Sequence, residues 1–282
     1  MLTSTFCHIP GIGLQMERTL WAAGIHTWET LRERRAGDFP LGPGRERIVR
    51  PFIDQSFVHL RQRNARFFAG LLPAEQHWRI FPEFRESLAY LDIETTGMGT
   101  PDDHITAVAL YDGRNLRSFV DGRNLDQFEE ALGEYEVIVT YNGKCFDVPF
   151  IRHAMGIPLD QVHIDLRYVL KSLGYAGGLK ACERKLGIGR GDLDGMDGFF
   201  AVLLWEDYTE NANERALDTL LAYNALDVVN LERLMILAYN MKLKGTPLHP
   251  AHLLPLPEMP EIPFKADLKT IERIKGRMFY YS

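Results

Sequence analysis

Acidic side chains at three separate places in the chain could form one chemical site. Asp92 and Glu94 lie two residues apart at the end of the apolar run 88–93, so in a β-strand both project from the same face. The Thr-Thr-Gly segment 95–97 adds hydroxyl groups and a flexible turn, which suit close approach of a phosphate backbone. An isolated Asp-x-Glu pair, however, is more simply part of a solvent-facing strand.

A third carboxylate, Asp147, follows the segment 141–146 (Tyr-Asn-Gly-Lys-Cys-Phe), in which a strand ends and a glycine turn leads into a helix. The positive end of the helix dipole favours a negative charge at that position. Taken alone, Asp147 is more simply a helix cap.

The last acidic position, Asp227, lies four residues after Tyr223 in a predicted helix, so the phenol and the carboxylate share one helical face. They can therefore act on one target, although a single Tyr-x-x-x-Asp pair is more simply a surface feature. The weight of the interpretation rests on the three elements together and in this order.

The surrounding elements must bring these side chains together. Short apolar runs predict strands over 88–93, 105–111, 116–120 and 137–141. Short turns between the first three favour antiparallel hairpins, whereas helices at about 125–133 and 148–155 favour parallel crossovers. A long helix with an apolar stripe is expected over about 214–242. The chain is therefore predicted to be an α/β protein, with a mixed sheet flanked by helices.

We predict three regions along the chain. Residues 1–72 form a small all-helical domain that includes a helical stretch over 53–70, residues 85–245 form the α/β domain, and residues 246–282 form a proline-containing linker and a basic helix from about 266 to 277. Trp78 and Arg79 lie between the first two regions, where they either guide a nucleic-acid strand or join the domains.

Composition and charge are those of a soluble globular protein, with 46% hydrophobic and 25% charged residues. No apolar run approaches the roughly 20 residues of a bilayer span, and no secretion signal is recognisable, so we expect a cytoplasmic protein without membrane contact. Three scattered cysteines indicate reduced thiols. Residues 67–241 carry 28 acidic and 15 basic side chains, and such an acidic centre suits divalent cations.

Three motifs resemble those of the DEDD 3′→5′ exonucleases, which have a ribonuclease-H-like fold. They are Leu-Asp-Ile-Glu-Thr-Thr-Gly at 91–97, Asn142-x-x-x-Phe146-Asp147, and Tyr223-x-x-x-Asp227. The last motif indicates the tyrosine variant, DEDDy, because the histidine variant would have His where this chain has Ala222. Segments 163–166 and 178–188 extend the resemblance to the YprB-type group of predicted exonucleases and imply a fifth strand.

The resemblance implies a 3′→5′ exonuclease that binds two divalent cations, Mg²⁺ or Mn²⁺, through oxygen ligands and acts on single-stranded nucleic-acid ends. In this hypothesis Asp92 bridges both cations, Glu94 and Asp227 hold the one on the nucleophile side, and Asp147 helps to position the other. Tyr223 orients the attacking water. Residues expected to contact the terminal nucleotide are Thr95, Thr96, Gly97, Asn142 and Phe146, although Phe146 is more simply a core residue.

The Pro-Gly-Ile-Gly unit at 10–13 is similar to a helix-hairpin-helix, whose turn amides hold phosphates without reading sequence, and this implies nucleic-acid contacts at Gly11 and Gly13. A purely structural turn is the alternative. Two other functions also stay open: a structure-specific endonuclease that uses the same site, and a non-catalytic nucleic-acid-binding module. DNA and RNA are equally compatible with the sequence.

Overall fold

The computed structural model describes residues 1–35, 40 and 42–278, so small parts of the predicted first and third regions lie outside the described residues. The strands are β1 (Leu88–Thr95), β2 (Ile105–Tyr111), β3 (Leu116–Val120), β4 (Val137–Thr140) and β5 (Val162–Asp165). The α-helices are α1 (Leu14–Ala22), α2 (Trp28–Glu33), α3 (Pro43–Arg61), α4 (Ala65–Leu71), α5 (Phe81–Phe84), α6 (Phe128–Leu132), α7 (Asp147–Met155), α8 (Leu166–Lys171), α9 (Leu179–Lys185), α10 (Gly198–Asn211), α11 (Glu214–Leu243) and α12 (Leu268–Met278). Short 3-10 helices are η1 (Leu2–Ser4), η2 (Ala74–Ile80), η3 (Arg85–Ser87), η4 (Leu125–Gln127) and η5 (Gly191–Leu193).

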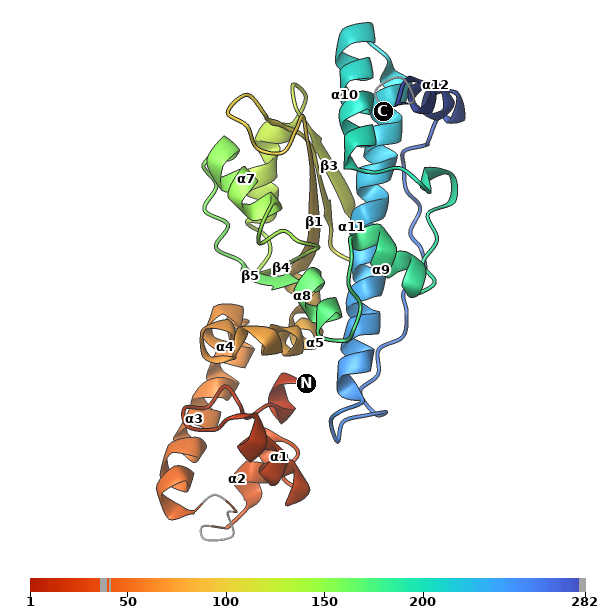
Figure 1. Cartoon of the computed structure of the whole chain (residues 1–282). Helices are drawn as coiled ribbons and strands as arrows, with labels where there is room; N and C mark the ends of the chain where they lie inside the picture. Colours follow the sequence, from red (N-terminus) through yellow and green to blue (C-terminus); the bar gives the residue numbers. More distant parts are fainter. Residues whose placement is uncertain (36–39, 41, 279–282) are drawn as a thin grey trace.

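The five strands form one mixed sheet in the order β3-β2-β1-β4-β5. The β1–β2 and β2–β3 pairs are antiparallel, in keeping with their short connections, whereas β1–β4 and β4–β5 are parallel. The chain enters β4 through α6 and β5 through α7. The prediction of a mixed five-stranded sheet flanked by helices is therefore confirmed. In Figure 1 this sheet lies between α7 on one side and α11 on the other.

The alternation of side chains along β1 separates its apolar residues from its acids. Leu91 and Ile93 pack with residues of α6 and α7, whereas Tyr90, on the opposite face, belongs to the cluster that includes residues of α11. Because side chains two residues apart share a face, Asp92 and Glu94 are also directed toward α11. The sheet thus delivers both carboxylates to the face that the longest helix covers.

The N-terminal helices pack against the C-terminal part of α11 through a continuous core. Trp78 and Phe81 lie with their ring centroids 5.9 and 6.0 Å from that of Tyr239. Arg79 is buried and pairs with Glu17 of α1 at 2.8 Å. Of the two interpretations of Trp78 and Arg79, these contacts therefore favour a joining role over contact with nucleic acid.

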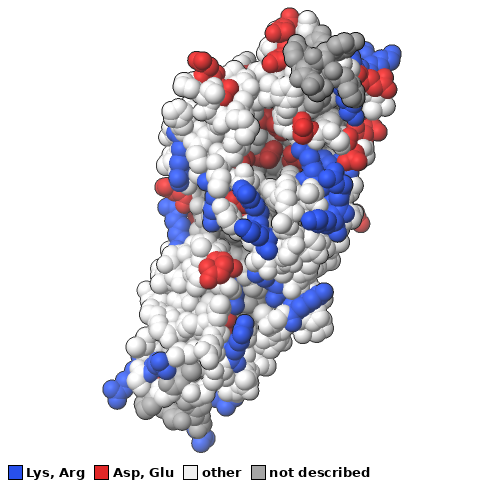
Figure 2. Space-filling model, viewed as in Figure 1, with Lys and Arg blue, Asp and Glu red and all other residues white. Residues whose placement is uncertain are grey.

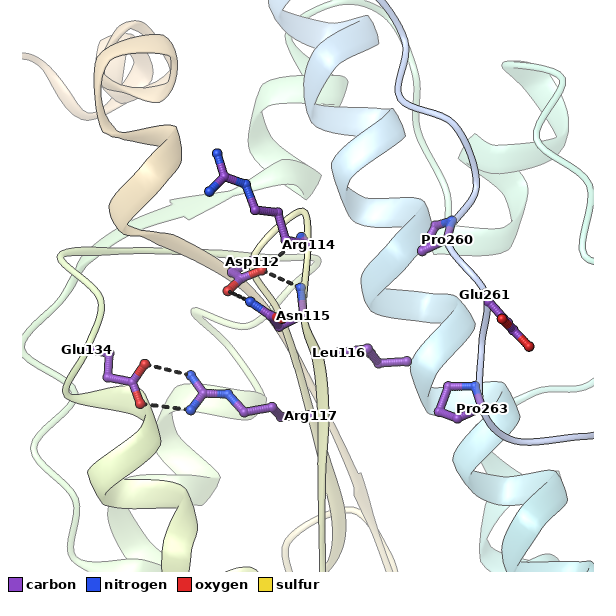
Figure 3. A pocket seen from close by; sticks show the side chains of 9 residues that line it. All are labelled: Asp112, Arg114, Asn115, Leu116, Arg117, Glu134, Pro260, Glu261 and Pro263. Carbon is purple, nitrogen blue, oxygen red and sulfur yellow. Dashed lines mark hydrogen bonds and ion pairs between the residues drawn. The ribbon is translucent and has the colours of Figure 1, made fainter.

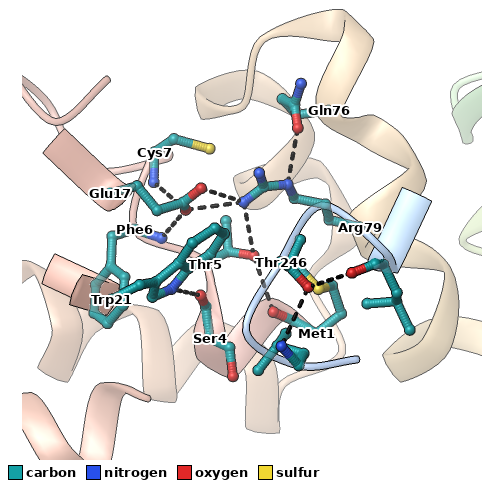
Figure 4. A network of polar contacts seen from close by, with 12 residues as sticks. Met1, Ser4, Thr5, Phe6, Cys7, Glu17, Trp21, Gln76, Arg79 and Thr246 are labelled. Carbon is teal, nitrogen blue, oxygen red and sulfur yellow. Dashed lines mark hydrogen bonds and ion pairs between the residues drawn. The ribbon is translucent and has the colours of Figure 1, made fainter. Parts of the chain in front are cut away.

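The Glu17 carboxylate also organises the chain start, as Figure 4 shows. Its Oε1 accepts hydrogen bonds from the amides of Phe6 and Cys7 at 2.7 and 3.1 Å. The Arg79 guanidinium in turn donates to Gln76 at 2.9 Å. A single buried ion pair thus connects three stretches of chain.

The helical stretch predicted over 53–70 is wrong in one respect, because the structure has two helices there. Arg63 adopts a left-handed φ of 55°, which ends α3, and the Asn64 side chain then caps α4 by accepting from the Phe67 amide at 3.0 Å. The helix predicted over about 266–277 is observed as α12. None of the helices within the described residues combines the length and apolar character needed to cross a bilayer.

We predict that Arg79→Met destabilises the protein by about 3–5 kcal/mol, because it leaves the buried Glu17 carboxylate without its counter-ion. The two side chains are only 5% and 1% exposed. Urea denaturation gives the free energy of unfolding. The control is Asp54→Ala, which removes the exposed Arg32–Asp54 pair and should change that free energy by less than about 1 kcal/mol. Equal effects of the two substitutions would contradict the role given to Arg79.

Candidate metal centre

Three carboxylates meet where the middle of β1 faces α11. Asp92 and Glu94 come from β1 and Asp227 from α11, and one carboxylate oxygen of each lies within 4.8 Å of the others. Glu94 and Asp227 are buried, whereas Asp92 is half-buried. In Figure 2, acidic atoms lie in a hollow in the upper half of the visible face, with basic atoms beside it.

The fourth carboxylate, Asp147, is buried at the first residue of α7. It lies outside the group of three within 4.8 Å, but its charge contributes to raising the pKa of both Asp92 and Glu94. The structure therefore gathers all four predicted acids in one region, three of them at ligand spacing.

Burying Asp92, Glu94 and Asp147 close to other carboxyl groups raises their pKa values. Burial, followed by the charge of Asp227, raises the pKa of both Asp92 and Glu94 well above the ordinary range. Burial likewise raises the pKa of Asp147 to about 7, although backbone hydrogen bonds oppose this shift. Without a cation among them, several of these groups resist ionisation.

One buried cation offsets part of the negative charge. The Arg190 guanidinium donates to Asp227 Oδ1 and also to both carboxylate oxygens of Glu183, at 2.9 and 3.0 Å. The Glu183 carboxylate also accepts a hydrogen bond from the side-chain amide of Asn230 at 2.8 Å. Arg190 therefore fixes the orientation of Asp227 and leaves its second oxygen for another partner.

The predicted tyrosine lies beside the acids. Tyr223 is buried on α11, and burial together with the neighbouring carboxylates raises the pKa of its phenol, so the phenol stays protonated. Lys180 Nζ donates to the phenol oxygen and lies 4.5 Å from the ring centroid. The next residue, Asn224, donates to Asp92 Oδ2 at 2.7 Å.

Lys180, Arg190 and Asn224 were not predicted as site residues. Arg190 and Lys180 lie 24 and 34 residues before the start of α11 along the chain, and no periodicity links them to it. Asn224 had a usable signal, because it directly follows Tyr223 in the third motif. The sequence signal for Lys180 was weaker: it belongs to the segment 178–188, which carries part of the family resemblance.

The turn after β1 is closely fitted. A side chain at Gly97 would place its Cβ 2.3 Å from Asp103 Oδ1, so the Asp103 carboxylate would have to leave its hydrogen bonds to the Gly99 and Thr100 amides. Thr95 Oγ1 donates to the Gly97 carbonyl at 2.6 Å, and Thr96 Oγ1 accepts from the His104 amide at 3.0 Å. Both hydroxyls, predicted to contact a nucleotide, thus also hold the turn.

The turn after β4 carries the other predicted contacts. Asn142 has a φ of 67°, and its side-chain oxygen accepts from Arg167 Nη1. Phe146 is half-buried, with its ring centroid 5.7 Å from that of Phe150, so part of the ring packs in the core as expected. Asp165 accepts from the Arg167 amide at 3.0 Å and so caps α8.

Gly11 and Gly13 lie far from this cluster in sequence and belong to the turn before α1. Gly11 has a left-handed φ of 81°, and Gly13 is the residue that precedes α1. The element before the turn is only the three-residue 3-10 helix η1, whereas a helix-hairpin-helix requires an α-helix there. Phosphate binding at these glycines stays a prediction.

A separate crevice of about 750 Å³ lies between the β2–β3 hairpin and residues 260–263 (Figure 3). Three of its charged side chains are engaged within the protein: Arg117 pairs with Glu134 at 2.8 Å, and Asp112 accepts from the backbone amides of Arg114 and Asn115. None of the acids of the β1–α11 cluster lines this crevice.

The donor set of the cluster fits hard divalent cations. Carboxylate oxygens are the ligands that Mg²⁺ and Mn²⁺ prefer, and the three grouped residues include neither His nor Cys. The raised pKa values of Asp92 and Glu94 are a second observation in favour, because a divalent cation would remove their mutual repulsion. Asp92, Glu94 and Asp227 could thus hold a cation directly, with Asp147 close by.

Comparison with known proteins gives one family. Residues 89–239, more than half of the chain, match RNase_H_2 of the RNase_H superfamily, and this range contains all four acids and Tyr223. No curated protein matches the chain.

Several solved structures resemble it at low identity. The family B DNA polymerase of Pyrobaculum calidifontis is 19% identical, with a TM-score of 0.40 over 56% of this chain and 24% of the polymerase, so the chain spans about a quarter of that protein. NrnC of Brucella melitensis bound to pGG is 19% identical and NrnC with bound Mg²⁺ is 18% identical, each with a TM-score of 0.40 over 58% of this chain and 77% of NrnC.

The pKa of Asp147 leads to a prediction about stability. Because its folded-state pKa of about 7 exceeds the ordinary value of 3.8, the contribution of neutral Asp147 to stability is fully present below about pH 4 and is lost as the pH rises through 7. In EDTA at about pH 8, Asp147→Asn should therefore raise the free energy of unfolding, by up to about 4 kcal/mol.

The same substitution provides its own control at about pH 4, where Asp147 in the folded protein is neutral like the Asn that replaces it, and the gain should fall below about 1 kcal/mol. Urea denaturation at the two pH values measures the difference. A variant that is destabilised equally at both would show that Asp147 does not carry a buried charge in the metal-free protein.

Proposed function

Because the chain belongs to the RNase H superfamily, we propose that it is a metal-dependent 3′→5′ exonuclease of the DEDDy type that hydrolyses single-stranded nucleic-acid ends. The observation that carries the proposal is the meeting of Asp92, Glu94 and Asp227 within 4.8 Å. Asp147 and a protonated Tyr223 lie beside them. Separate segments of chain thus supply the acids that phosphodiester hydrolysis by two cations requires.

Each acid has a distinct part in holding the cations, Mg²⁺ or Mn²⁺. In this proposal Asp92 would contribute to both cations, Glu94 and Asp227 would hold the one on the nucleophile side, and Asp147 would help to position the other. The cations, when bound, activate the attacking water and neutralise the leaving 3′ oxygen. Arg190 holds Asp227 in place, and Asn224 does the same for Asp92.

Tyr223 orients the attacking water by hydrogen bonding. Its raised pKa keeps the phenol protonated, so it acts as a hydrogen-bonding group and not as a base. Lys180 donates a hydrogen bond to the phenol oxygen and so holds its position. The terminal nucleotide lies against the two fitted turns, which present Thr95 and Thr96 on one side and Asn142 and Phe146 on the other.

The decisive experiment uses the whole chain and 5′-labelled 20-nucleotide DNA and RNA with Mn²⁺ or Mg²⁺. We expect products that shorten from the 3′ end by one nucleotide at a time, and no reaction in EDTA. A circular single strand, which has no 3′ end, should not be cleaved. Cleavage of the circle would favour the endonuclease alternative, and binding without cleavage would favour the non-catalytic module.

We expect Asp92→Asn to lower kcat at least about 100-fold, because it removes the carboxylate that both cations share. Mn²⁺ should raise the thermal unfolding temperature of the wild-type protein but not of this variant. Asp102→Asn, a change of the same type at an exposed position, should retain full activity and the Mn²⁺ effect. Normal activity of Asp92→Asn would remove the basis of the proposal.

Tyr223→Phe should lower kcat by about 100-fold with little change in KM, since a misplaced water slows the reaction without weakening substrate binding. The measurement is steady-state hydrolysis of a single-stranded oligonucleotide. Tyr239→Phe removes a hydroxyl from the same helix far from the acids and should leave kcat unchanged. An increase in KM alone for Tyr223→Phe would place the phenol in substrate binding.

A further inference from the structure

Four exposed residues form a basic and aromatic surface next to the acid cluster. They come from the turn after β4 and from α8, and we call them the basic edge: Lys144, Arg167, Tyr168 and Lys171. None of the three cations has a carboxylate oxygen within 4.0 Å among the described residues. Their charge is therefore available to a ligand.

The two halves of the basic edge are fixed to each other by a buried carboxylate. Asp165 accepts hydrogen bonds from the backbone amides of Asn142, Lys144 and Arg167 at 2.8, 3.1 and 3.0 Å. The carboxylate of Asp165 is thus occupied by backbone donors and aligns the start of α8 with the turn. The backbone that carries Lys144 and Arg167 is therefore held in place by these hydrogen bonds.

The basic edge is continuous with the proposed active site. Arg167 donates to the side chain of Asn142, a proposed contact of the terminal nucleotide, and Asp147 lies three residues after Lys144. Tyr168 is 49% exposed, with Lys144 Nζ 5.9 Å from its ring centroid. A charged group and an accessible aromatic face therefore lie side by side.

We propose that the basic edge binds the single-stranded nucleic acid upstream of the nucleotide being removed, with Lys144, Arg167 and Lys171 on phosphates and Tyr168 stacked on a base. This inference rests on the proposed function, which puts the 3′ end among the acids. Cations interleaved with an exposed aromatic ring match single-stranded nucleic acid better than an acidic peptide, which offers no flat face for Tyr168.

The test is equilibrium binding of a fluorescent 12-nucleotide single strand in EDTA, followed by anisotropy over a range of salt concentrations. The double variant Lys144→Ala/Arg167→Ala should weaken binding about tenfold or more and reduce the slope of log affinity against log salt by about 1.4, because two phosphate contacts are lost. The control Arg114→Ala/Lys269→Ala removes the same side-chain types at exposed positions elsewhere and should change neither value.

A second variant tests the aromatic contact without changing charge. Tyr168→Ala should weaken binding about tenfold with an unchanged salt slope, and Tyr168→Trp should restore affinity. The proposal is overturned if the double variant binds like the control, or if a poly-glutamate peptide competes as well as the unlabelled 12-nucleotide strand. Since binding is measured without hydrolysis, a protein that binds as expected but cleaves nothing would refute only the proposed function.

Discussion

Mutual repulsion among buried carboxylates is the constraint on which this structure depends. Asp92, Glu94 and Asp227 are held within 4.8 Å of one another, and the charge of Asp227, after burial, raises the pKa of both Asp92 and Glu94. Such a cluster is unfavourable by itself, so the surrounding fold must impose it. The apolar packing of β1 and α11 supplies the stabilisation, and Arg190 supplies a positive charge that pairs with Asp227.

Two cationic side chains, Arg190 and Lys180, lie beside the acid cluster. Arg190 binds Asp227 and Glu183, and both Arg190 and Lys180 lie over the ring of Tyr223, at 5.2 and 4.5 Å from its centroid. Buried Arg190 thus brings positive charge to Asp227, whereas Asp92 is the most exposed of the three grouped acids. A cation entering from solvent meets the least shielded carboxylate first.

Much of the architecture could be predicted from local pattern, and the site only in part. Alternation along β1 placed Asp92 and Glu94 on one face, and i, i+4 spacing placed Tyr223 with Asp227, because both rules operate within one element. Arg190 could not be found this way, since its partnership with Asp227 spans 37 residues. Helix α10 was not predicted because its apolar run 199–205 has no polar face to mark a helical period.

The length of α11 has a consequence for how the protein unfolds. Its 30 residues extend about 45 Å, with Asp227 near the middle and Tyr239, 12 residues later, packed on Trp78 and Phe81. Loss of the N-terminal helices would expose this end of α11 and fray it toward the acids. The two halves of the molecule are therefore one cooperative unit, and amide protons around Asp227 should exchange with solvent together with those of η2.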